Sequence, residues 1–220
     1  MMDHSKREAL FVAALLACAV MLVGCNEGNV RSPKTDEPEA VVYTGKRAGM
    51  LEKLDKDFQN SDVHFELGRS YRGDGLWTKA EYHFETAVRF DPTNRAAQAA
   101  LTKLLISNGE KAKADLNAGR YIKQAAYSLK ETMKLANAFK AEQLEDYAVA
   151  CYRQAVRIWP ESPDGYRELG HYYLSTNDKD AAKEYFKRSF RLDPTQSQVA
   201  GELGRLGVIV RVLRDTGGPG

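Results

Sequence analysis

Cysteine is scarce in this chain of 220 residues, which has three: Cys18, Cys25 and Cys151. Two of them lie in the first 25 residues, so Cys151 has no disulfide partner in the remainder. The fold therefore has to be held by packing rather than by disulfides. Cys151 is expected to be a small structural residue rather than a reactive thiol.

An excess of one charge is also missing, since 32 basic residues face 30 acidic ones and the formal net charge is +2. This balance gives no overall field that would favour a nucleic acid partner. The sequence has no His-Glu-x-x-His and no paired-cysteine motif, and the glycines of Gly68–Gly75 lack the Gly-Lys-Ser/Thr ending of a phosphate loop. We therefore expect no enzymatic activity, no cofactor and no metal, and interpret carboxylates such as Glu142 as parts of solvated helix faces.

Long hydrophobic runs are limited to one stretch of 15 residues, Ala9–Val23, which follows Lys6 and Arg7. As a helix this stretch would span about 22 Å, short of the ~30 Å hydrocarbon core of a bilayer. It is therefore predicted to be a signal peptide rather than a transmembrane anchor.

The end of this stretch, Leu22-Val23-Gly24-Cys25, resembles the lipobox of bacterial lipoproteins. The resemblance implies a signal peptide at 1–24, lipid on Cys25 and membrane attachment through that lipid. Residues 25–46, rich in polar residues, Pro and Gly, are predicted to be a flexible tether. Because Asn26 rather than aspartate follows the cysteine, the resemblance implies an outer-membrane location facing the periplasm. An ordinary secretory signal with an unmodified Cys25 is the alternative.

The chain does contain an internal repeat of 34 residues, with copies at 61–94, 95–128, 129–162 and 163–196. We call the position within a copy its phase. Small residues recur at phases 8, 20 and 27, leucine or aromatic residues at phases 7, 11 and 24, and proline at phase 32. The first copy carries Leu67, Gly68, Tyr71, Ala80, Phe84, Ala87 and Pro92, and the last carries Leu169, Gly170, Tyr173, Ala182, Phe186, Ser189 and Pro194. The second copy is degenerate, with Ala118, Tyr121 and Ala126 at phases 24, 27 and 32. Such a period predicts stacked pairs of antiparallel helices, with proline ending each second helix.

This pattern resembles the tetratricopeptide repeat. The resemblance implies an all-α fold, a right-handed α-solenoid of helix-turn-helix units spanning 61–196. The flanking residues are predicted to form an N-terminal capping helix at 47–60, a C-terminal capping helix at 197–214 and a disordered tail at 215–220.

In the repeat family the first helix of each unit lines a groove that binds partners, mainly through phases 2, 5, 9, 12 and 13. Carried onto this sequence, the resemblance gives ten candidate partner-binding residues: Phe65, Arg69, Arg72, Lys103, Lys130, Met133, Asn137, Lys140, Arg167 and His171. Six of them are cations, opposed at these phases by Asp62 and Asp164. We expect an acidic partner segment, anchored on Phe65 or Met133. The alternative is that these are ordinary solvated side chains.

The leading hypothesis is a lipid-anchored adaptor or scaffold of the cell envelope that binds a segment of another envelope protein. It is similar in architecture to pilotins and to other envelope repeat lipoproteins. One alternative is a binder of an anionic envelope polymer, held by the basic groove. A further alternative is self-association through the apolar residues of Val199–Val212.

Overall fold

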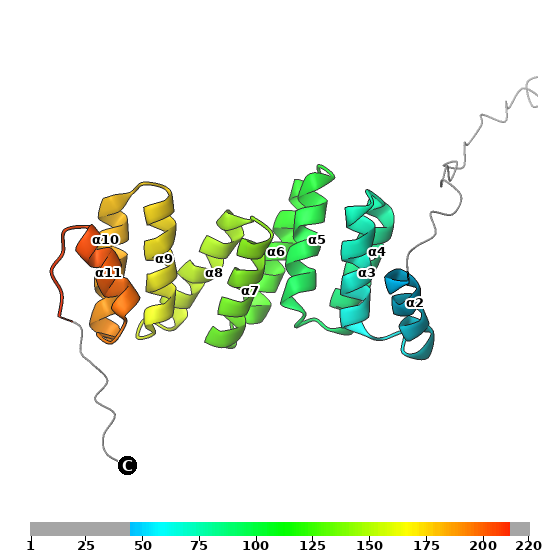
Figure 1. Cartoon of the computed structure of the whole chain (residues 1–220), viewed down its shortest axis with the longest axis horizontal. Coiled ribbons are helices and arrows are strands. Elements are labelled where there is room, and N and C mark those ends of the chain that lie inside the picture. Colours follow the sequence, from blue (N-terminus) through cyan, green and yellow to red (C-terminus); the bar gives the residue numbers. More distant parts are fainter. Residues whose placement is uncertain (1–44, 212–220) are drawn as a thin grey trace, which may run out of the picture. The chain divides into compact units, whose positions relative to one another are not determined.

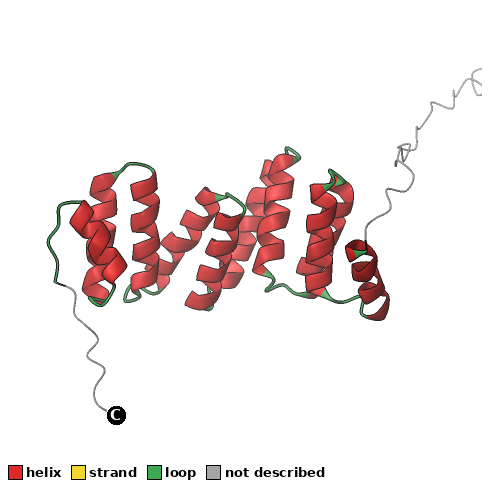
Figure 2. Cartoon of the chain, viewed as in Figure 1, coloured by secondary structure: helices red, strands yellow, loops and turns green. Residues whose placement is uncertain are grey.

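The computed structural model describes residues 45–211, and every regular element in this range is a helix (Figures 1 and 2). The helices are α2 (Lys46–Lys56), α3 (Ser61–Gly73), α4 (Trp77–Phe90), α5 (Arg95–Ser107), α6 (Lys111–Ala125), α7 (Leu129–Ala141), α8 (Glu145–Ile158), α9 (Pro163–Ser175), α10 (Lys179–Leu192) and α11 (Ser197–Arg205). Among these helices none is long and apolar enough to cross a membrane. The predicted signal peptide, the lipidation site Cys25, the predicted tether up to residue 44 and the predicted tail lie outside the described residues.

The helices pair as the 34-residue repeat predicts. Each copy forms one antiparallel pair, α3 with α4, α5 with α6, α7 with α8 and α9 with α10, and each pair packs against the next. Helix α2 covers the first pair through α3, and α11 covers the last through α10. The helices follow one another in sequence order (Figure 1). This arrangement is an all-α solenoid, as the sequence predicted.

The helix boundaries follow from local sequence. Asn60 and Asn94 precede the first helices of two copies, and their side chains accept hydrogen bonds from the amides of Val63 and Ala97 at 3.1 and 2.9 Å. Such caps satisfy amide donors that have no partner in the first helical turn. The second helices α4, α8 and α10 end two residues before Pro92, Pro160 and Pro194, as predicted. Helix α6 has Ala126 at phase 32 and nevertheless ends at Ala125, so proline is not required for the helix to end there.

The turn between the two helices of each copy has the same backbone conformation in all four copies. Phase 15 adopts a positive φ, in Gly75 (74°), Gly109 (83°), Gln143 (59°) and Asn177 (62°). This left-handed conformation favours glycine and is tolerated by asparagine. Gln143 is therefore the residue least suited to its position.

The core is built by the repeated phases that the sequence identified. Leu67, Phe84, Leu169 and Phe186 are almost completely buried. In the degenerate second copy the aromatic bulk is relocated by one turn along α6, since Ala118 and Tyr121 are both buried and Tyr121 supplies the ring. The second copy consequently forms a helix pair despite its departures from the pattern.

Both capping helices are shorter than predicted. Helix α2 ends at Lys56, and α11 ends at Arg205 rather than at residue 214. Gly207 has a φ of 78°, and the Val208 amide donates to the Leu203 carbonyl at 2.8 Å, the kind of hydrogen bond that closes a helix C-terminus. Beyond it Val208 and Val210 pack against the apolar cluster of α10 and α11, while Ile209 is fully exposed.

Candidate partner-binding surface

The ten predicted residues all lie on the first helices α3, α5, α7 and α9, and we call this set the first-helix face. Arg69, Lys130, Asn137 and Lys140 are exposed, whereas Phe65, Arg72, Lys103, Met133, Arg167 and His171 are partly buried. None is fully buried, so each has some surface available for contact.

Two apolar side chains of this face rest on the core. The Phe65 ring centroid lies 6.0 Å from that of Phe84, and the Arg69 guanidinium lies 5.7 Å from the Phe65 ring. Met133 packs against the buried cluster in the middle of the array. Both residues therefore offer a partly exposed apolar contact on a fixed support.

Four of the six cations form ion pairs within the protein. Arg69 lies 3.3 Å from Glu66, Arg72 2.9 Å from Glu142, Lys140 3.9 Å from Glu168 and Arg167 2.9 Å from Asp164. Three of these carboxylates were not predicted from the sequence, because Glu66, Glu142 and Glu168 occupy phases 6 and 14 rather than the predicted groove phases. Glu142 is thus a partner of Arg72 rather than part of a solvated face, and the excess of positive charge is smaller by three than predicted.

The remaining polar groups of this face are uncommitted. Within residues 45–211 the side chains of Lys103, Lys130, Asn137 and His171 form no hydrogen bond or ion pair. The His171 ring stands edge-on to Phe186 with centroids 5.0 Å apart. These four side chains are free to contact a ligand.

A further ion pair that the sequence did not reveal joins the first helices of copies two and three. The Arg95 Nε lies 3.2 Å from Glu131, with the two side chains 5% and 15% exposed. Arg95 also donates to Gln98 at 3.1 Å, and Lys134 lies 3.2 Å from Glu131. Although burial opposes ionisation, hydrogen bonds from Lys134 and Arg95 hold the pKa of Glu131 below its usual value. This pair fixes α5 against α7.

No cluster of three or more metal-ligating side chains occurs among residues 45–211. Cys151 is buried with a free thiol, and burial raises the pKa of that thiol to about 12, against the opposing effect of the Arg95 charge. The thiol is therefore protonated near neutral pH, which disfavours nucleophilic chemistry.

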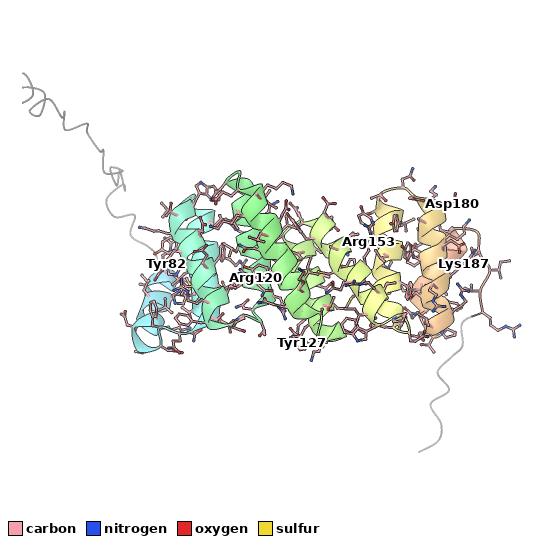
Figure 3. The ribbon with its side chains drawn as sticks, turned by 180° about the vertical axis from the view of Figure 1, so that it is seen from behind. Tyr82, Arg120, Tyr127, Arg153, Asp180 and Lys187 are labelled. Carbon is pink, nitrogen blue, oxygen red and sulfur yellow. The ribbon has the colours of Figure 1, made fainter. Side chains whose placement is uncertain are left out.

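The opposite surface is formed by the second helices. Figure 3 shows Tyr82 of α4, Arg120 of α6, Arg153 of α8 and Lys187 of α10 on this side. An open hollow of about 490 Å³ lies along α6 and is lined by Asp115, Leu116, Gly119, Arg120, Lys123 and Gln124. Leu116 is 74% exposed there. This surface provides positions for control variants of the first-helix face.

The four helix pairs, their 34-residue spacing and their shared turn conformation define the class of this protein, an α-solenoid of helix-turn-helix repeats. The family model described as tetratricopeptide repeat matches residues 164–196, which correspond to the fourth copy.

Among proteins of known identity, the chain is similar to the type IV pilus assembly protein PilF of Pseudomonas aeruginosa. The two are 29% identical over 150 residues, which cover 66% of this chain and 58% of PilF. The chain thus matches less than two thirds of the length of that relative.

Solved structures with similar helical arrays include MamA, at 22% identity and a TM-score of 0.40, covering 69% of this chain and 89% of that one. A structure of Pseudomonas aeruginosa PilF matches at 24% identity and a TM-score of 0.38, covering 72% of this chain and 69% of that one. YrrB, described as a TPR protein with an unusual peptide-binding site, matches at 16% identity and a TM-score of 0.40, covering 70% and 80%.

Proposed function

We propose that this protein is a lipid-anchored adaptor of the bacterial cell envelope whose first-helix face binds a segment of a partner protein. The observation that carries the proposal is the set of uncommitted side chains, Lys103, Lys130, Asn137 and His171, beside the supported apolar contacts Phe65 and Met133. A partly exposed apolar anchor with polar groups around it suits a peptide better than a small charged ligand.

The similarity to PilF supports an assembly role in the envelope. That relative is named for type IV pilus assembly, and we propose that the partner of this chain is likewise a component of an envelope machine. Membrane attachment through Cys25, on the periplasmic side of the outer membrane, is the part of the proposal that rests on the lipobox resemblance.

An anionic polymer is the less favoured ligand. Four of the six cations on the first-helix face already have carboxylate partners, which lowers the charge available to a polymer. Polymer binding would fall steeply with ionic strength, whereas a peptide seated on Phe65 and Met133 would keep its apolar contribution.

The test of partner capture uses a photo-crosslinking amino acid at position 133, in the full-length protein in native membranes. A second protein carries the same amino acid at position 116 on the opposite surface. We expect mass spectrometry to identify an envelope protein crosslinked from position 133 and not from position 116. Crosslinking from position 116 alone would refute the proposed surface.

Charge variants sharpen this test. Reversing the uncommitted cations in Lys103→Glu with Lys130→Glu is expected to abolish capture without lowering the melting temperature. The matched control is Lys123→Glu with Lys179→Glu, two exposed lysines of α6 and α10. Capture that is equally weakened by both pairs would reflect net charge rather than a specific site.

Membrane attachment has its own test. Cys25→Ser is expected to release the protein from the membrane fraction and to abolish incorporation of labelled fatty acid. An unchanged distribution would favour the alternative of an ordinary secretory signal.

A further inference from the structure

One ion pair of the first-helix face crosses an entire repeat. Arg72, near the end of α3 in the first copy, donates through Nη1 and Nη2 to the two carboxylate oxygens of Glu142, which follows α7 in the third copy. The two distances are 2.9 and 3.2 Å. The paired, parallel geometry of guanidinium and carboxylate is the strongest and most specific form of this interaction.

The intervening helix α5 packs against both α3 and α7. At phase 12, where α3 carries Arg72, α5 carries Ile106, which packs against the core clusters of both neighbours. Lys103, one turn earlier on α5, forms no ion pair in the described part of the chain. The direct link between Arg72 and Glu142 is therefore made by side chains reaching past α5.

The pair is accessible to solvent and to competitors. The Arg72 side chain is 26% exposed and the Glu142 side chain 19% exposed. The Arg95–Glu131 pair, by contrast, includes an arginine side chain that is 5% exposed. The other pairs of the first-helix face join residues within one helix or on adjacent repeats, so a contact across a repeat is not a general requirement of the stack.

We propose that Glu142 is a displaceable internal ligand of Arg72, and that the partner segment replaces it with a glutamate side chain of its own. This inference rests on the proposed function and deepens it, because it names the acidic residue that the partner must carry. The free protein already shows that a glutamate carboxylate fits Arg72 in the two-point geometry.

Internal occupation of Arg72 by Glu142 lowers the affinity for a partner. A site that is occupied internally binds an external ligand more weakly, in proportion to the fraction of time that it is open. Because solvent screens this partly exposed pair even in its two-point geometry, we expect the occupation to weaken binding by about tenfold. Removing the Glu142 charge should strengthen the binding of an external ligand by the same factor.

The test uses the full-length purified protein and a defined probe, an eight-residue peptide of alternating glutamate and leucine. The probe is amidated at its C-terminus and labelled with an uncharged dye, and its dissociation constant is measured by fluorescence anisotropy. A matched probe replaces every glutamate by glutamine, and a third is the glutamine peptide with a free C-terminal carboxylate. The variants are Glu142→Gln, Glu142→Gln with Arg72→Gln, and the control Glu66→Gln.

Glu66 is the matched control because it also pairs with an arginine of α3, through one contact of 3.3 Å to Arg69. We expect Glu142→Gln to bind the glutamate peptide about tenfold more tightly than wild type. Glu66→Gln should change affinity by less than about twofold, since its pair is a single exposed contact. Adding Arg72→Gln should remove the gain, and the glutamine peptide should show none.

Several outcomes would overturn the inference. These are no gain in Glu142→Gln, an equal gain in Glu66→Gln, or a gain that survives Arg72→Gln. A gain seen only with the free C-terminal carboxylate would show that Arg72 selects a chain terminus instead of a side chain. Melting temperatures of all variants identify any loss of binding that comes from unfolding.

Failure of this inference differs from failure of the proposed function. If crosslinking from position 133 succeeds and Glu142→Gln has no effect, the first-helix face binds a partner without exchange at Arg72. If crosslinking from position 133 fails, the proposed function is refuted whatever the behaviour of the peptide.

Discussion

Gly170 of α9 lies directly against the ring of Phe186 in α10, so closely that a Cβ atom at Gly170 would stand 2.6 Å from two ring carbons. The same relationship joins Gly68 and Phe84 in the first copy. Phases 8 and 24 are therefore linked by close contact between a backbone and a ring. A side chain at Gly68 or Gly170 would have to move the ring that fills the centre of its helix pair.

We expect Gly170→Ala to lower the free energy of unfolding by about 1–3 kcal/mol, because the added methyl group overpacks this contact. The control is Gly119→Ala in α6, where a Cβ atom would meet nothing within 4 Å. That substitution should raise stability by about 0.5–1 kcal/mol, since alanine is the better helix former. Urea unfolding followed by circular dichroism measures both. Equal effects of the two substitutions would contradict the packing account.

Arg95 is expected to be important for stability. Arg95→Met leaves Glu131 with only the exposed Lys134 as a charged partner, and we expect a loss of about 2–4 kcal/mol. Lys134→Met removes the other contact to Glu131, but its side chain is 57% exposed, so the loss should be below about 1 kcal/mol. Chemical denaturation of the two variants tests this difference, and a larger effect at Lys134 would disprove it.

Gln143 is expected to be a site of stored backbone strain. Gln143→Gly should raise stability by up to about 1 kcal/mol, because glycine adopts the positive φ at this turn without steric conflict. Asn177→Gly at the same phase should have a smaller effect, since asparagine tolerates that conformation. Thermal unfolding of the two variants ranks them. A loss of stability in Gln143→Gly would show that the side chain matters more than the backbone.

Stability is expected to fall with acidification through a buried histidine pair. The Nδ1 atoms of His64 and His83 are 2.9 Å apart, and Nε2 of His64 is 2.9 Å from the Phe58 carbonyl oxygen. Since that oxygen can only accept, His64 donates from Nε2, and His83 donates to its Nδ1. Burial, and then repulsion from His64, lower the pKa of His83 from 6.5 to about 4.

The direction of the change in stability with pH follows from this lowered pKa. Below pH 6.5 the unfolded chain binds a proton at His83, whereas the folded protein does not until the pH approaches 4. The contribution of neutral His83 to the free energy of unfolding is therefore complete above pH 6.5 and is lost as the pH falls towards 4. Between pH 7 and 5 we expect a loss of about 1–2 kcal/mol after allowance for solvent screening. In His83→Phe the slope over this interval should be smaller, although the variant is less stable overall. An unchanged slope would assign the pH dependence to other groups.

The fold was largely predictable from sequence because the 34-residue period is carried by residues that meet one another in space. The burial of Leu67, Phe84 and Ala87 could be predicted from their residue type and their phase. The lengths of the capping helices were not predictable in the same way, because no repeat constrains them. The end of α11 at Arg205 depends on the turn at Gly207, whose effect competes with the apolar pattern that continues beyond it.

For the polar side chains of the candidate site, the sequence predicted their location on the first helices but not their ion-pair partners. The phase rule placed Arg72 and Lys140 on the first helices, as the structure has them. It did not reveal their partners, since Glu142 is 70 residues from Arg72 in sequence and no local spacing connects the two. The same holds for Arg95 and Glu131, which are 36 residues apart in sequence and are brought together by the packing of α5 against α7.

A stack of similar repeats leaves an apolar face at each end, onto which a further repeat could pack. Such an array therefore needs a terminating element that covers this face. Helix α11 and the strip of Val208 and Val210 serve that purpose here, because they cover apolar surface of α10 that another helix would otherwise cover. The terminator is itself thin, since it consists of nine helical residues and a short non-helical strip. Growth of the array by head-to-tail addition of a second molecule is thus opposed at this end by the shortest helix in the described part of the protein.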